Sequence, residues 1–370
     1  MPGLLLDHPA PDFEGLLSIL RGEKTPGRVP IVEIGIDTEV LRGIQESLLD
    51  EPWALPDGVG GPSSPNERYY QQLINLYYRL GYDFVPLWPL WVNLPPGKIR
   101  QVADTAKASR GLRDWVDESG ALIRSWEDFE RFPWNRIHAA PETLEMAARY
   151  IPESMKVTVS ATLFESIFES LLGYEGLFFC MRDNPQLVES VFDRWGQIVY
   201  EYYQSTVEWD VVGAIFHADD MGFKTGTMIS PADLRRLLFP WLAKYAALAH
   251  EHGKPFWIHS CGNLYRNSPS VMDDLIDLVK IDGFHSFQDV ILPVGEAKAR
   301  YGDRLALMGG VDMDKLATLP EDELRSYLRA ILDSCMTGGR FAFGSGNTIA
   351  NFVPLQNYAI LLEEAHQWKV

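Results

Sequence analysis

The stretch SPADLRRLLFPWLAKYAALAHEHGKPFWIHSCGN, residues 230–263, predicts a helix followed directly by a buried strand. Ser230 and Pro231 are typical of a helix N-terminus, and Gly253 is typical of a helix C-terminus. The apolar run 255–258 is short and continuous, as expected for a parallel strand covered on both faces. This order of helix and strand is the repeating unit of an α/β fold.

Apolar runs and helical patterns alternate along most of the chain. The runs that predict strands are 29–35, 84–88, 156–161, 211–216, 255–260, 283–287, 304–310 and 340–346. Helical patterns cover 66–81, 230–253, 319–335 and 353–368, and Pro240 predicts a kink in the second of these. Eight strands with intervening helices favour an α/β fold, a single (β/α)8 barrel of the TIM type over residues 1–370.

Residues 89–155 depart from this alternation. They contain loops and short strand-like pieces such as GALIRSW, residues 120–126. We interpret 89–155 as an irregular insertion after the second strand, which distorts the barrel but stays within the single domain.

The composition excludes several classes of partner. The chain has 370 residues, 46% of them apolar, and a formal net charge of −18. This charge repels phosphate backbones and anionic membranes, so we expect no nucleic-acid or membrane partner. It still allows an anionic ligand in a local basic pocket. No apolar run approaches the ~20 residues that a membrane-spanning helix needs.

The cysteines indicate a reducing compartment. Cys180, Cys261 and Cys335 are odd in number and widely spaced, which does not fit a disulfide framework. The N-terminal residues 1–13 lack a basic start and a long apolar core, so they do not resemble a signal peptide. We therefore expect a cytoplasmic protein.

Polar side chains follow most of the predicted strands. In barrels of this type the chemistry takes place at the carboxyl ends of the strands. The residues at or after these ends are Glu33, Trp88, Glu165, Asp219, Asp220, His259, Cys261, His285, Asp312 and Asn347. Several of them can bind a metal or move a proton.

His259 and Cys261 are the strongest pair for a metal site. Residues two apart on an extended chain point to the same side, and imidazole and thiolate are ligands that zinc prefers. A third ligand would come from Glu33, Asp220 or Asn347, and carboxylates suit zinc better than an amide. The alternative is a hydrogen-bonded core histidine beside a buried, inert cysteine.

Three carboxylates have two interpretations each. Asp219 and Asp220 are adjacent, so we expect only one to face the cavity, while the other orients a ligand or caps a helix. Glu33 interrupts an apolar strand, where a carboxylate is costly unless it is paired or ligated.

Three further side chains are site candidates with a structural alternative. His285 follows a strand, but such a histidine is often a satisfied core residue. Trp88 and Trp91 lie in an aromatic cluster that would line an apolar pocket or simply pack.

Together, several motifs resemble the uroporphyrinogen decarboxylase superfamily, whose fold is a distorted (β/α)8 barrel and which also contains corrinoid-dependent methyltransferases. The stretches that carry the resemblance are GEKTPGRVPIVE (22–33), LGYDFVPLW (80–88), GALIRSWEDFERFPW (120–134), 171–193, 219–263, GFHSFQDV (283–290) and YGDRLALMGGVD (301–312). The resemblance covers most of the chain.

The resemblance favours the methyltransferase branch. EIGIDTEVLRGIQ, residues 33–45, lacks the paired arginines of the decarboxylases, and Leu90 stands near the position of their pyrrole-binding aspartate. The methyltransferases carry His-x-Cys at the position of His259 and Cys261, and a second cysteine after the last strand. Asn347 stands in place of that second cysteine, and also of the decarboxylase histidine.

The resemblance implies a methyltransferase that moves a methyl group between a corrinoid on a carrier protein and a small thiol or methoxylated aromatic. Zinc bound by His259, Cys261 and Glu33 would activate the acceptor or donor. The catalytic residues would be Asp220, Asp219 and Glu33, and Trp88, Trp91, His285 and Asn347 would contact the substrate. The alternatives are a metal-free uroporphyrinogen decarboxylase and a non-catalytic protein that binds a tetrapyrrole or corrinoid. An apolar barrel surface is also compatible with a homodimer.

Overall fold

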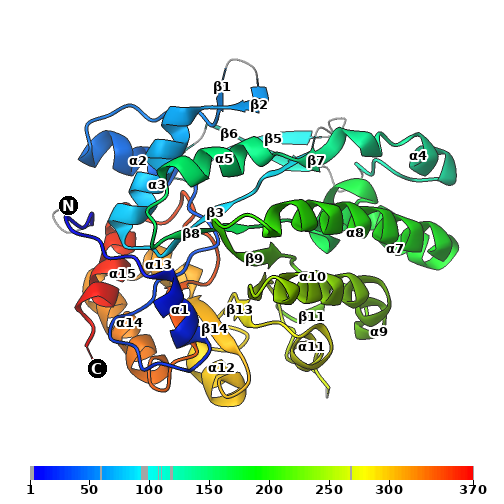
Figure 1. The fold of residues 1–370 in the computed structure, drawn as a ribbon. Coiled ribbons are helices and arrows are strands. Elements are labelled where there is room, and N and C mark those ends of the chain that lie inside the picture. Colours follow the sequence, from blue (N-terminus) through cyan, green and yellow to red (C-terminus); the bar gives the residue numbers. More distant parts are fainter. Residues whose placement is uncertain are drawn as a thin grey trace.

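The computed structural model describes residues 4–58, 61–92, 99–106, 108–109, 111–116, 120–266 and 269–369. Its centre is a seven-stranded parallel sheet that curls into a half-barrel (Figure 1). In spatial order the strands are β15 (Phe341–Ser345), β14 (Ala306–Val311), β13 (Gly283–His285), β12 (Phe256–His259), β9 (Val212–Ala218), β8 (Lys156–Val159) and β3 (Phe84–Leu87). Each coincides with a predicted strand to within a few residues, and the α/β prediction is confirmed.

The first predicted strand, 29–35, is an extended segment rather than a full strand. It forms isolated parallel bridges with the far edge of the sheet, Ile31 with Phe343 and Ile36 with Ile349. Between the bridges, the backbone N–H of Ser345 donates to the carboxylate of Glu33 instead of a main-chain carbonyl. Gly344 permits this close approach, because a Cβ there would lie 1.8 Å from the carbonyl oxygen of Val32.

Helices cover the outside of the sheet, as the alternation predicts. The main ones are α2 (Thr38–Leu48), α3 (Glu67–Leu80), α7 (Tyr174–Asp183), α8 (Pro185–Val207), α10 (Phe239–Glu251), α12 (Val294–Tyr301), α13 (Met313–Thr318), α14 (Glu321–Cys335) and α15 (Leu355–Gln367). α3 begins at an Asn66 cap and ends at Gly81, whose φ of 92° closes the helix in the left-handed region. Before α10, the chain forms α9 (Pro231–Asp233) and a π-helical turn over 234–238, directly ahead of Pro240.

The described part of 89–155 forms short antiparallel pairs, two α-helices and a 3-10 turn. β4 (Leu90–Val92) pairs with β7 (Ile137–Ala139), and β5 (Ile99–Ala103) pairs with β6 (Leu112–Val116). The segment 120–126 contains no strand; Ser125 instead caps α4 (Trp126–Arg131) through its hydroxyl. α5 (Pro141–Tyr150) then packs on α3 and leads into β8, so this last part completes the barrel's helical layer.

The remaining elements are short connections. They are β1 (Asp57–Gly58), β2 (Gly61–Pro65), β10 (Gly222–Phe223), β11 (Gly226–Thr227), α6 (Phe164–Ser166), α11 (Val271–Asp274), a 3-10 turn at Trp134–Arg136 and π-helical turns at Ile167–Leu171 and Leu275–Val279.

The space inside the curled sheet is filled with aromatic side chains. The rings of Phe84, Phe216 and Trp257 contact one another, with centroids 5.7–6.4 Å apart. Phe13, from α1 (Phe13–Leu20), packs against Phe84 and Trp257 and so closes the amino-terminal end of the strands. The interior is therefore a packed core and not a channel.

Candidate metal centre

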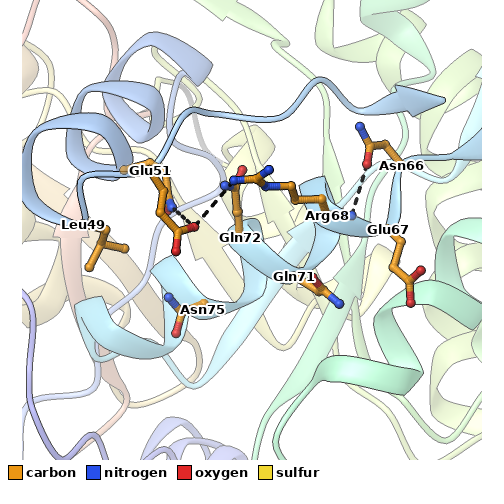
Figure 2. A pocket seen from close by; sticks show the side chains of 9 residues that line it. Leu49, Glu51, Asn66, Glu67, Arg68, Gln71, Gln72 and Asn75 are labelled. Carbon is orange, nitrogen blue, oxygen red and sulfur yellow. Dashed lines mark hydrogen bonds and ion pairs between the residues drawn. The ribbon is translucent and has the colours of Figure 1, made fainter. Parts of the chain in front are cut away.

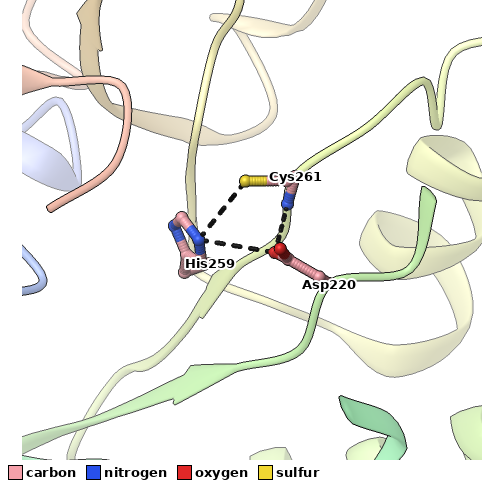
Figure 3. A group of neighbouring side chains, drawn as sticks. All are labelled: Asp220, His259 and Cys261. Atoms are coloured by element: carbon pink, nitrogen blue, oxygen red, sulfur yellow. Dashed lines mark hydrogen bonds and ion pairs between the residues drawn. The ribbon is translucent and has the colours of Figure 1, made fainter. Parts of the chain in front are cut away.

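Asp220, His259 and Cys261 come together where two adjacent parallel strands end. β9 and β12 are in register with Ala218 opposite His259, so the residues that follow β9 lie beside those that follow β12. Nε2 of His259 lies 3.5 Å from Oδ1 of Asp220 and 3.7 Å from Sγ of Cys261. One oxygen, one nitrogen and one sulfur thus lie within 4.8 Å of one another (Figure 3).

These separations suit a tetrahedral zinc ion. Zinc–ligand bonds of about 2.0–2.3 Å at tetrahedral angles place neighbouring ligand atoms about 3.3–3.6 Å apart. The two distances from His259 Nε2 match this edge length. Asp220 is partly open to solvent, with 32% of its side chain exposed, whereas 8% of the His259 side chain is exposed. The donor set therefore fits a zinc site with three protein ligands and one position open to a small molecule.

The electrostatics of the pair reinforce this arrangement. Burial acts to raise the pKa of Asp220, but the hydrogen bond and charge of His259 and the Cys261 N–H outweigh it and hold this pKa below its ordinary value. Burial likewise acts to lower the pKa of His259, yet its hydrogen bonds to Asp220 and Cys261 raise it to about 10. Without a metal, His259 is therefore a cation that neutralises Asp220.

His285 lies behind His259. The two Nδ1 atoms are 2.7 Å apart, and His285 is completely buried. Burial, followed by the charge on His259, lowers the pKa of His285, so His285 is the neutral partner that accepts a hydrogen bond from Nδ1 of His259. Gly309, with a φ of 86°, makes room for the His285 ring, because a Cβ there would lie 2.9 Å from Nε2. The structure thus places His285 where it positions His259, not where it would contact a substrate.

Cys261 is anchored by its backbone and by polar neighbours of its sulfur. Its N–H donates to Oδ1 of Asp220 over 2.7 Å. Nδ2 of Asn347 donates to Sγ over 3.3 Å, and the Ser286 hydroxyl lies 3.5 Å from Sγ. The orientation of the Asn347 amide is set by Thr348 N–H, which donates to its Oδ1. Asn347 therefore occupies the position from which a second cysteine would reach the same point.

Asp219 points away from its neighbour Asp220. Its carboxylate lies at hydrogen-bond distance, 2.8 Å, from Nε2 of His217. It also accepts hydrogen bonds from the backbone N–H groups of Leu163 and Glu165. Tyr203 in turn contacts Nδ1 of His217 at 2.8 Å. The prediction that only one of the two aspartates faces the site agrees with this geometry, and Asp219 fixes the start of the helical segment 164–171.

That segment carries two carboxylates toward the centre. Burial, then the charges of Asp220, Glu169 and Asp219, raise the pKa of Glu165 to about 8. Burial and Asp220 also raise the pKa of Glu169. The sequence analysis placed Glu165 at a strand end without a role and missed Glu169. The signal for Glu169 is its i, i+4 spacing from Glu165, which puts both side chains on one face of a helix.

Glu33 does not join the metal ligands. Its carboxyl group is fully buried, hydrogen-bonded to the backbone N–H and the hydroxyl of Ser345. The same hydroxyl also lies 2.6 Å from the carbonyl oxygen of Asn347. The Ser345 hydroxyl has one proton, which it donates to the carbonyl oxygen of Asn347. The hydrogen bond between Ser345 and Glu33 therefore needs a proton on Glu33, and burial raises the pKa of Glu33 to about 8. Glu33 is therefore a neutral support for the 345–347 turn, not a ligand.

The tryptophan predictions remain untested. Trp88 is 49% exposed and lines a small aromatic cavity with Tyr69, Tyr70 and Tyr77. Trp91 lies in β4 opposite His138, and its side chain is outside the described residues. A second cavity, on α2 and α3, is polar and contains none of the metal-centre residues; Asn66, Arg68, Gln71 and Asn75 are among those that line it (Figure 2).

Comparison with known proteins decides the family. The sequence profile described as uroporphyrinogen decarboxylase (URO-D) matches residues 120–368. The chain belongs to the uroporphyrinogen decarboxylase family. Curated relatives of that name include one from Cupriavidus necator, 34% identical over 82 residues, and one from Psychromonas ingrahamii, 26% identical over 193 residues. The first match covers 21% of this chain and 22% of that relative. The second covers 51% of this chain and 50% of that relative.

A solved structure of a methyltransferase from Methanosarcina mazei has a similar fold. It superposes with a TM-score of 0.67 and 18% identity, over 96% of this chain and 98% of that one. The TIM-barrel-like fold of this URO-D family member is thus shared with a methyltransferase. None of the helices in the described part of the chain has the length and apolar composition needed to cross a bilayer.

Proposed function

We propose that this protein is a methyltransferase that exchanges a methyl group between a corrinoid, carried by a separate protein, and a small thiol or methoxylated aromatic. The observation that carries the proposal is the convergence of Asp220, His259 and Cys261 at the end of β9 and β12. Family membership and the fold shared with a methyltransferase support it.

The three residues would hold zinc. A zinc ion there would lower the pKa of a thiol, or polarise an ether oxygen, at its open position. The protein residues prepare this site. His285 fixes the ring of His259 so that Nε2 faces the other ligands, and Asn347 donates to the Cys261 sulfur.

Glu165 is the residue we propose to accept the proton of the incoming thiol. Its pKa of about 8 lies near neutral pH, where a carboxylate can take up a proton and release it again. Asp220 lies close enough to raise that pKa, which supports a position of Glu165 near the centre. The thiolate sulfur would then attack the methyl group of the corrinoid co-substrate, and the electron pair of the broken cobalt–carbon bond would stay on cobalt.

The second candidate is a decarboxylase acting on a porphyrinogen, which the name of the family and of its curated members favours. Its substrate is a polycarboxylate. The charge of Asp220 raises the pKa of both Glu165 and Glu169, and an anionic substrate at this site would meet the same repulsion. The same carboxylates favour a bound cation.

Two assays on one preparation test the proposal. Purified protein with zinc is mixed with methylcobalamin and 2-mercaptoethanol, and loss of the methylcobalamin absorbance is followed. We expect turnover that Cys261→Ser abolishes and that the control Cys180→Ser, outside the site, retains. Conversion of uroporphyrinogen by the metal-free protein, with no loss of methylcobalamin absorbance, would overturn the proposal in favour of the decarboxylase.

A further inference from the structure

Another pocket, distinct from the two cavities described above, lies at the opposite end of the strands from the metal centre. It is a cavity of about 310 Å³, formed where β12, β13, β14 and β15 begin and where α1 ends. Its walls are the apolar side chains of Leu17, Leu20, Trp257 and Ile281. The packed rings of Phe84 and Phe216 separate it from the residues that follow β9 and β12. It is therefore a distinct site, and its volume suits a small metabolite.

The charge of this pocket is opposite to that of the protein. Arg21, Lys254, Arg304 and Arg340 line it, against one carboxylate, Asp282. The chain as a whole carries a net charge of −18. A concentration of positive charge in such a chain attracts anions locally, although the overall field opposes them.

Not all of these charges are free to bind a ligand. Arg304 is paired with Asp277 at 2.6 Å, and Lys254 donates to the carbonyl oxygens of Val207 and Trp209. Asp282 is also occupied, because it accepts from Nε2 of His250 at 2.7 Å and from the backbone N–H of Phe256 at 2.8 Å. Both of these hydrogen bonds fall on Oδ2, so one oxygen of the pocket's acidic group is already engaged.

Arg21 and Arg340 differ from these residues, because neither forms an ion pair with any residue that the structure describes. Arg21 is the exposed residue that ends α1. Arg340 precedes β15 and is half-buried. Two unpaired guanidinium groups that line one cavity can donate to an anion from both sides.

The position of Arg340 is held by the backbone. Its φ of 52° is in the left-handed region, where residues other than glycine are uncommon, and it follows Gly338 and Gly339, which are also left-handed. Its N–H donates to the carbonyl oxygen of Ile19 at 2.8 Å. The side chain lies over Gly22, where an added Cβ would be 2.8 Å from Nε of Arg340. Residue 340 is therefore an arginine at a backbone position where glycine would be less strained, and its side chain is directed over Gly22.

Interaction with helix ends explains only part of this cluster. Cations at the C-terminal end of a helix are favoured by its carbonyl groups, and this accounts for Lys254 and for part of the charge of Arg21. Arg340 lies on no helix itself, but its N–H donates to Ile19 in the last turn of α1, so that helix end accounts for part of its charge as well.

We propose that this pocket binds a small oxyanion, a phosphate or carboxylate group, between the guanidinium groups of Arg21 and Arg340. The apolar wall formed by Leu17, Leu20 and Ile281 would hold the body of the ligand. The inference does not depend on the chemistry of the metal centre.

Titration calorimetry with inorganic phosphate and with succinate, at an ionic strength held constant with chloride, tests the proposal. We expect saturable binding of at least one anion to the wild-type protein, and comparison of the two arms identifies the preferred group. Arg340→Gln and Arg21→Gln should each weaken that binding about tenfold or more. Arg182→Gln, on α7 and paired with Asp183, is the matched control and should bind as the wild type does.

Two results would overturn the proposal: no saturable binding of either anion, or equal binding by Arg21→Gln and the wild type. Arg21 is exposed at a helix end, so its substitution leaves the core intact even if Arg340→Gln fails to fold. Circular dichroism of each variant confirms that the fold is retained.

Discussion

Nδ1 of His259 lies 2.7 Å from Nδ1 of His285, so one buried histidine sets the ring of another. Only one proton can lie between these two nitrogens. His285 is the partner whose pKa is lowered, and that proton therefore belongs to His259. Its other nitrogen, Nε2, then faces Asp220 and Cys261. A histidine here replaces the carboxylate or carbonyl that commonly orients a metal-bound imidazole.

Replacing His285 should weaken metal binding without removing a ligand. We expect His285→Ala to lower zinc affinity by about 10- to 100-fold, the usual cost of losing a group that orients a ligand. His285→Gln retains an acceptor and should recover part of this loss. Competition with a zinc chelator measures the affinities. Equal affinity of His285→Ala and the wild type would show that His259 needs no support from His285.

Zinc binding should strengthen as pH rises from 6 to 8. The pKa of His259 is raised to about 10 in the metal-free protein, so a proton occupies Nε2 over this range and competes with the metal. Zinc displaces the proton on Nε2 of His259 and the thiol proton of Cys261, so the apparent affinity should increase by about tenfold to a hundredfold per pH unit. The same chelator competition at several pH values gives the slope. A slope near zero would mean that His259 is already deprotonated, or that it is no ligand.

Glu33→Gln should stabilise the fold at high pH. The pKa of Glu33 is about 8 when folded, against 4.5 ordinarily, so the native state holds a proton that the unfolded chain releases. Stability from this group is present below pH 4.5 and is lost as pH rises to 8, with a limiting slope of about 1.4 kcal/mol per pH unit. Glutamine keeps the hydrogen bonds of the neutral form but has no proton to lose.

Urea unfolding between pH 5 and pH 8.5 measures this effect. The free energy of unfolding of Glu33→Gln relative to the wild type should increase across the range. Glu153→Gln, at an exposed position, controls for the change in net charge. A difference that does not vary with pH would show that Glu33 is ionised in the native state.

Asn347→Cys should tighten zinc binding. Nδ2 of Asn347 already lies 3.3 Å from the Cys261 sulfur, so a thiolate at this position would add a soft ligand to the centre. An increase in zinc affinity over the wild type supports the assignment. Unchanged affinity would place residue 347 outside the coordination sphere.

The local sequence predicted the framework of the fold well. Continuous apolar runs gave the parallel strands, and the helical pattern over 66–81 matched α3. Closure of the barrel was not predictable from the runs. It depends on how regularly 29–35 pairs with β15: the main chain of Pro30 and Val32 pairs with Phe343, but the carboxyl group of Glu33 takes the hydrogen bond of Ser345.

The candidate site was predictable only in part, because its geometry depends on which strands are neighbours in the sheet. His259 and Cys261 are two residues apart, so their spacing alone indicated a common direction. The choice of third ligand between Asp220 and Glu33 depended on which strand end lies beside β12, and this is a property of the sheet order. The pairing of His259 with His285 likewise depends on the neighbouring strand, β13, and left no signal in the sequence. The carrier protein, the oligomeric state and the cytoplasmic location stay predictions.

X-ray absorption at the zinc edge, on protein loaded with one equivalent of zinc, tests the central claim most directly. The account predicts one sulfur at about 2.3 Å and nitrogen or oxygen ligands at about 2.0–2.2 Å. In Cys261→Ser the sulfur contribution should disappear. Zinc that is not retained by the folded wild-type protein, or a zinc spectrum without sulfur, would contradict the account.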